Sequence, residues 1–116
     1  MAIPSGSGTE VLKRAYAHAI SNSNSTIITG VANHIYTILS IVWCEQGAAA
    51  ETISLYSNYD GGVTPIKFLE AQALPANGTF TWNDKIVLTG TDTLVTLTGS
   101  AANVDWWCSY IDQDWT

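Results

Sequence analysis

The sequence predicts an all-β fold, an antiparallel β-sandwich that is jelly-roll-like, and three observations support this prediction. Segments of roughly four to ten residues rich in Val, Ile, Thr, Tyr and Trp, which favour strands, recur along most of the chain. Clusters of Gly, Pro, Asn and Asp separate these segments at short intervals, as turns between antiparallel strands require. Several segments alternate apolar and polar residues, which is the pattern of a strand with one buried face.

The first eight residues are expected to form an extended N-terminal arm, and residues 9–116 a single β-sandwich domain. Residues 1–8 contain two Gly, two Ser and one Pro, so they do not favour a helix and add little to a core. They also lack the basic start and apolar run of a secretory signal. Ile3 and Pro4 are the apolar residues of the arm, and we expect them to contact a partner.

Residues 9–20 fit either a helix or a strand. As a helix, the segment would place Leu12 and Tyr16 on one face. As a strand, its odd-numbered residues 11–17 form an apolar face apart from Lys13. We prefer the strand because the remainder of the chain is β.

Residues 35–45 form the strongest predicted strand. Simple alternation would place Leu39, Ile41 and Trp43 on one face and the even-numbered residues on the other. Both faces are mostly apolar, which predicts a central strand covered on both sides.

A hairpin is predicted after residues 51–59, which alternate in polarity. Asp60-Gly-Gly follows, and Asp-Gly between alternating segments is a strong hairpin signal because glycine tolerates positive φ. Residues 63–69 would return as the partner strand. Pro65 lacks an N–H group, so this strand is expected at an edge or a bulge.

The last strand, residues 104–111, places Trp106 and Trp107 on opposite faces. One indole is therefore expected in the core and the other on the surface or in an interface. Residues 112–116 are expected to form a polar tail. Further strands are expected over residues 26–31, 79–82, 86–88 and 94–98.

Charge is scarce in this chain. Only 12% of its 116 residues are charged, whereas about 25% is usual, and the net charge is −6. Four basic residues argue against nucleic-acid binding, and no apolar stretch is long enough to predict a transmembrane helix, so we expect neither nucleic acid nor membrane as a partner. A surface so poor in charge favours a domain packed against other protein.

No residue cluster predicts catalysis, a metal site or a cofactor. His18 and His34 have no Cys, Asp or Glu at a metal-ligand spacing, so we expect surface or interface histidines. Cys44 and Cys108 could form one disulfide, but without a secretory signal we expect free, buried thiols. Both lie in apolar strands, which favours unreactive thiols over a nucleophile.

Calcium is the metal that the acidic residues would suit best. Glu10, Asp105, Asp112 and Asp114 supply carboxylates, but the spacing of a calcium loop is absent. We expect a solvated acidic terminus instead.

Aromatic residues are the best candidates for a binding surface. Exposed Trp marks either a protein interface or a sugar site, and the interface is preferred because the usual polar cluster for sugar hydroxyls is missing. The expected partner-contact residues are Ile3, Pro4, Leu12, Trp82, Trp107 and Trp115.

Three stretches resemble a family of small structural proteins of tailed, chiefly marine, bacteriophages. They are residues 3–14 (IPSGSGTEVLKR), 83–94 (NDKIVLTGTDTL) and 100–110 (SAANVDWWCSY). The chain departs from the family pattern at Trp106 and Trp107, where residues are more often small or β-branched.

The resemblance implies a non-enzymatic virion protein, assembled in the host cytoplasm. The first expectation is a head decoration (cement) protein that binds the major capsid protein or other virion proteins as a homo-oligomer, with a trimer as the natural guess. The alternatives are a tail, neck or fibre component, or a carbohydrate-binding receptor module.

Overall fold

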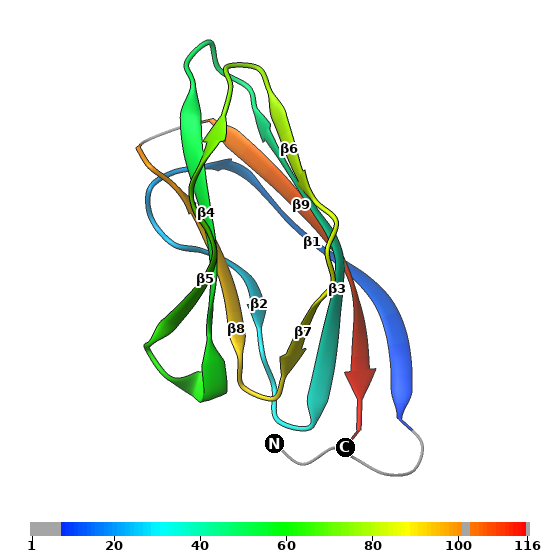
Figure 1. Ribbon diagram of the computed structural model, residues 1–116. Helices are drawn as coiled ribbons and strands as arrows, with labels where there is room; N and C mark the ends of the chain where they lie inside the picture. The colour runs from blue at the N-terminus through cyan, green and yellow to red at the C-terminus, as the bar shows by residue number, and fades with distance from the viewer. Residues whose placement is uncertain (1–7, 101–102, 116) are drawn as a thin grey trace.

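The computed structural model describes residues 8–100 and 103–115, and most of them lie in strands (Figure 1). Of the expected arm, residues 1–7, including Ile3 and Pro4, lie outside the described residues. One 3₁₀ turn, η1, spans Tyr59–Gly61. The strands are β1 (Thr9–Ile20), β2 (Ser25–Thr29), β3 (His34–Glu45), β4 (Glu51–Asn58), β5 (Pro65–Leu74), β6 (Thr79–Trp82), β7 (Ile86–Thr89), β8 (Thr93–Thr98) and β9 (Val104–Asp114).

The strands form two antiparallel sheets that pack face to face, which confirms the predicted all-β sandwich. The five-stranded sheet has the order β1-β9-β3, with β6 and β7 both pairing the far side of β3. The four-stranded sheet has the order β2-β8-β4-β5. Because β1 pairs β9 in one sheet and β2 pairs β8 in the other, the chain is rolled up from its two ends, as in a jelly roll.

The ambiguous N-terminal segment is a strand. β1 runs from Thr9 to Ile20 and pairs with β9 along its length. Propensity alone did not decide between helix and strand, and the pairing with β9 does. β1 is also an edge strand, and Lys13 is an inward-pointing charge on it, which discourages pairing with foreign strands.

β3 is the central strand, as predicted, but its expected alternation was wrong. Its pairing with β9 shifts between Ile38 and Ser40, so Leu39 is an extra, bulged residue. Beyond the bulge the faces exchange, and Ile41 and Trp43 join Ile38 in the core. The expected cover on both sides was also wrong, because no described element packs over the outer face of β3.

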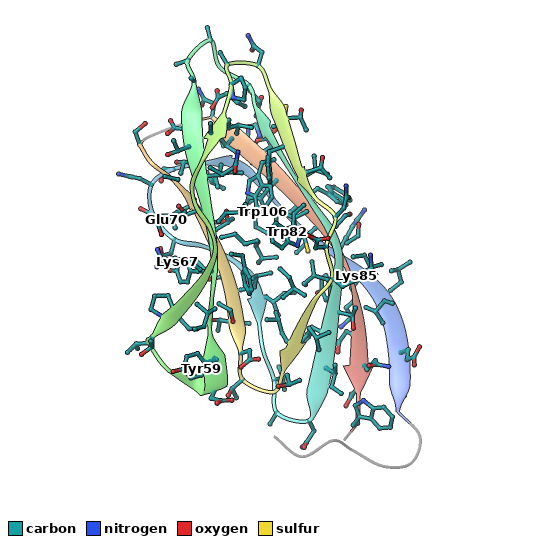
Figure 2. All side chains as sticks on the ribbon, viewed as in Figure 1. Tyr59, Lys67, Glu70, Trp82, Lys85 and Trp106 are labelled. Carbon is teal, nitrogen blue, oxygen red and sulfur yellow. The ribbon has the colours of Figure 1, made fainter. Side chains whose placement is uncertain are left out.

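The core lies between the sheets and is built from large aliphatic and aromatic side chains. Trp43 is fully buried, and its Nε1–H donates to Thr96 Oγ1 across the sandwich at 3.0 Å. Trp106 is 3% exposed and donates to Ser25 Oγ at 3.1 Å. These hydrogen bonds satisfy the indole N–H groups that burial removes from water. Figure 2 shows Trp106 and Trp82 between the two sheets.

The predicted hairpin joins β4 to β5. Its turn is η1, in which Asp60 and Gly61 have φ of 54° and 69°, so the positive backbone angles expected of Asp-Gly are present. Pro65 begins β5, the edge strand of the four-stranded sheet, as predicted.

The C-terminal segment is not the polar tail that was expected. β9 continues to Asp114, because it is paired on both sides, by β1 and by β3. As predicted, Trp106 and Trp107 face opposite sides of this strand. Both cysteines are free, Cys108 buried in the core and Cys44 half-buried on the outer side of the sheet. Burial raises the pKa of the Cys108 thiol to about 12, so it stays protonated and inert.

Candidate functional site

The outer face of the five-stranded sheet, which points away from the other sheet, is the main uncovered surface with aromatic character. It carries the outward-facing side chains of β1, β9, β3, β6 and β7, and no described element packs over it (Figure 1). Its most exposed large apolar residues are Leu12 (71%), Tyr16, Val87 and Trp107 (45%). A sheet face of this composition is typical of an interaction surface.

An aromatic cluster lies on the outer face where the edge strand β1 pairs with β9. Tyr16 on β1 is the cross-strand neighbour of Trp107 on β9, and their rings stack with centroids 5.2 Å apart and planes 17° apart. The guanidinium carbon of Arg14 lies 5.3 Å from the Trp107 ring centre and 5.8 Å from that of Tyr16. The arrangement combines stacking with a cation–π contact and holds all three side chains in place.

A groove beside this cluster, here called the arginine groove, runs over β1, β9 and β3. Its volume is about 690 Å³, and its lining contains no carboxylate. The apolar walls come from Leu12, Leu39 and Trp107, and the positive charge comes from Arg14, because the Lys13 ammonium points inward to Asp112. The complete lining is Leu12, Lys13, Arg14, Leu39, Trp107 and Ser109.

A smaller groove of about 270 Å³ lies on the other side of Trp107, along the strands. Val42 and Cys44 of β3 contribute to its lining, together with His18 and Asp105. Asp105 Oδ1 accepts from the backbone N–H of Ala19 at 2.8 Å and lies 2.8 Å from His18 Nδ1. This groove therefore offers the aromatic side chains of Tyr16 and Trp107 beside one carboxylate and one imidazole.

A buried carboxylate lies behind the outer face, between the sheets. Asp112 is 6% exposed and accepts hydrogen bonds from Lys13 Nζ at 2.8 Å and His34 Nδ1 at 2.7 Å. Burial by itself would raise the pKa of Asp112, but the hydrogen bonds and charges of Lys13 and His34 outweigh it and lower the pKa. The same hydrogen bond raises the pKa of Lys13. The arrangement ties β1, β9 and β3 together.

His34 and Asp112 are both more buried than the sequence predicts. His34 is not a plain surface histidine, because its ring is mostly buried against Asp112 and stacks on Tyr36. Asp112 is not part of a solvated acidic terminus, since Lys13 and His34 enclose it. Within the described residues, no group of three or more His, Cys, Asp or Glu side chains could hold a metal ion.

The residues expected to contact a partner are spread over the molecule. Leu12 and Trp107 share the outer face and both line the arginine groove. Trp82 is half-buried between the sheets, 6.2 Å from the ring of Phe68 (Figure 2). Trp115 is half-buried, close to the backbone of Gly8. Of the four expected residues that the structure describes, it thus brings together Leu12 and Trp107, and Ile3 and Pro4 lie outside the described residues.

Comparison with solved structures shows the fold. The chain is similar to a protein of the structure "Bacillus endospore appendages form a novel family of disulfide-linked pili", at 17% identity and a TM-score of 0.58, covering 100% of this chain and 97% of that one. It is also similar to a protein of the "Acidic stable capsid structure of Helicobacter pylori bacteriophage KHP30", at 12% identity and a TM-score of 0.54, covering 98% and 92%.

Sequence comparison adds no family to this fold. No protein-family model matches the chain, and no curated protein is significantly similar to it. The described part of the chain holds no helix long and apolar enough to cross a membrane.

Sequence reasoning missed Arg14, Tyr16 and Asp105 as parts of the site. The alternation of β1 did place Arg14 and Tyr16 on one face with Leu12, and Asp105 shares a face with Trp107 by the same rule. What the sequence lacked was the pairing of β1 with β9, which sets Tyr16 against Trp107.

Proposed function

We propose that this chain is a non-enzymatic structural protein of a bacteriophage particle, specifically a head decoration protein that binds the outer capsid. The observation that carries the proposal is the uncovered outer face with its Arg14, Tyr16 and Trp107 cluster. Trp, Tyr and Arg are the residue types that dominate the binding energy of protein interfaces. A chain with few charges loses little hydration when such a face is covered.

The fold lends further support. The two similar structures are those of a bacteriophage capsid and of disulfide-linked pili, and both are extracellular or viral assemblies built from protein. A jelly-roll domain can therefore serve as a building block in both. For this chain, the resemblance to phage structural proteins favours the capsid, and a tail, neck or fibre position is the alternative location in the same particle.

The proposed mechanism is the burial of surface against the major capsid protein or a neighbouring virion protein. A stable interface buries about 1,600 Å² in total, of which a few central residues supply most of the binding energy. Many copies on one symmetric shell add avidity, and we propose a homo-oligomer, with a trimer suited to the threefold positions of a shell. Ile3 and Pro4 are proposed as additional contacts to the shell.

The substitution Trp107→Ala tests this function. Purified protein is added to shells that lack it, and the bound copies are counted after sedimentation of the shells. Loss of the central indole should weaken binding at least tenfold, whereas the fold should persist because this side chain is half exposed. Val31→Ala, which truncates an exposed apolar residue in the β2–β3 loop, is the control. Equal occupancy by the Trp107→Ala variant and wild type would reject the outer face as the capsid-binding surface.

A carbohydrate-binding function is the second candidate, favoured by the smaller groove. Trp107 borders that groove together with His18 and Asp105, which could bind sugar hydroxyls. Titration of tryptophan fluorescence with host polysaccharides tests it. A saturable change that Trp107→Ala abolishes would favour this candidate over the decoration role, and an unchanged spectrum with every polysaccharide would count against it.

A further inference from the structure

We propose that a second copy of this chain occupies the arginine groove, and that it does so with the tip of its β4–β5 hairpin. Copies would then associate head to tail, through a contact that is not symmetric. This contact rests on the proposed function and deepens it, because it names the partner for the part of the outer face that β1, β9 and β3 form.

The groove is basic and apolar on an acidic molecule. The chain has a net charge of −6, yet no carboxylate lines the arginine groove. The charge of Lys13 is paired with Asp112, whereas the contacts of the Arg14 guanidinium are the rings of Tyr16 and Trp107. A guanidinium that lies over an aromatic ring can still donate hydrogen bonds to a carboxylate through the N–H groups at its edge. The groove therefore suits an acidic group flanked by apolar side chains.

The hairpin tip presents such a group. Val63 is 90% exposed, and Tyr59 and Ile66 are about half exposed, so three large apolar side chains surround the turn that contains Asp60. Asp60 is itself exposed, and its carboxylate forms no ion pair among the described residues. An apolar tip with a central acid matches an apolar groove with a central base.

The tip is held in shape before any contact forms. The backbone N–H of Asp60 donates to Asp92 Oδ1 at 2.7 Å, and the N–H of Gly62 donates to the carbonyl oxygen of Tyr59 at 3.0 Å. Asp92 also accepts from the N–H of Thr89 at 2.9 Å, which anchors the turn to the end of β7. A preordered tip loses little conformational entropy on binding, and this favours association.

The tip and the groove lie on opposite sides of the sandwich, so one molecule cannot satisfy both. Figure 1 shows the β4–β5 hairpin on the four-stranded sheet at the lower left, and β1, β9 and β3 on the opposite side. Figure 2 places Tyr59 at that hairpin end. A docked pair would still offer one free tip, on one copy, and one free groove, on the other. Contacts of this kind close into a ring or extend into a filament.

Exchanging the two charges tests the proposal, by sedimentation velocity on the purified full-length chain at about 0.15 M salt, without any shell. Wild type should sediment faster as its concentration rises. Arg14→Glu alone and Asp60→Lys alone should each weaken association at least tenfold, because like charges then meet. An equimolar mixture of the two variants should associate again, since every contact in an alternating assembly pairs opposite charges.

The doubly exchanged chain, Arg14→Glu with Asp60→Lys, should also self-associate. The control is the matched exchange Asp84→Lys with Lys85→Glu, on two exposed residues between β6 and β7, which should leave association as in wild type. A wild-type chain that stays monomeric up to about 1 mM would overturn the proposal. So would single variants that associate like wild type, or a mixture that fails to associate.

Shell binding is measured separately, which keeps the two proposals apart. A chain that binds shells but does not self-associate keeps the decoration function and loses this inference. A chain that self-associates through the exchanged charges but binds no shell keeps the inference and loses the decoration function.

Discussion

Asp112 illustrates how this chain keeps a charge inside a sandwich that has few charges. Its carboxylate is almost fully buried, and Lys13 and His34 hydrogen-bond to its two oxygens. A buried carboxylate without such partners would be strongly destabilising. Because the partners come from β1 and β3, the cluster also fixes how both strands lie against β9.

The substitution Asp112→Asn should lower stability in a pH-dependent way. The pKa of Asp112 is below its ordinary value of 3.8 in the folded chain, so ionisation stabilises the fold above that pH. This contribution is lost as the pH falls through the lowered pKa. Urea unfolding at pH 7 should show a loss of about 2 kcal/mol, and the difference from wild type should shrink toward pH 2.

Asp84→Asn is the matched control for this measurement, since Asp84 is exposed between β6 and β7. Its unfolding curves should follow those of wild type at every pH. A difference between Asp112→Asn and wild type that stays constant from pH 7 to pH 2 would contradict the role assigned to the Asp112 charge.

The sequence could not predict this cluster, and the reason is physical. Lys13, His34 and Asp112 lie far apart along the chain, and only the pairing of three strands brings them together. Local patterns did predict the opposite faces of Trp106 and Trp107, because alternation along one strand depends only on neighbouring residues.

At the scale of elements, the bulge in β3 governs which side chains reach the core. Leu39 is the extra residue in the pairing with β9. Along the other edge of β3, β7 pairs with residues 35–38 and β6 with residues 41–44, so the change from one strand to the other falls at the bulge. The sequence did not predict the bulge because both faces of β3 are mostly apolar, so either face could be buried. The hairpin, by contrast, was predictable because Asp60-Gly-Gly dictates its own backbone angles.

Two single-residue deletions in β3 should therefore have very different effects. Deleting Leu39 removes the bulge and leaves Ile38 and Ile41 facing the core, so the chain should still unfold cooperatively, with a loss of about 1–3 kcal/mol. Deleting Val42 shifts the alternation and forces either Trp43 or Ile41 out of the core, which should cost at least about 3–5 kcal/mol. Thermal unfolding followed by circular dichroism compares them. Equal damage by both deletions would mean that Leu39 is not the bulged residue.

At the scale of the whole molecule, the two sheets differ in what they present to a partner. The five-stranded sheet carries the aromatic outer face with Arg14, Tyr16 and Trp107, and the four-stranded sheet carries the apolar, acidic hairpin tip. Composition predicted a domain packed against other protein, because charge was scarce along the whole chain. It did not predict where, since the surface depends on which strands are neighbours.

The proposed decoration role is tested by cryo-electron microscopy of the intact phage particle that is proposed to carry this chain. We expect density for the sandwich on the outer capsid lattice, with the outer face of the five-stranded sheet covered by protein and residues 1–7 against the shell. Density at the neck or tail would favour the alternative location. Absence of the chain from the particle, or an outer face that points into solvent at every position, would contradict the account.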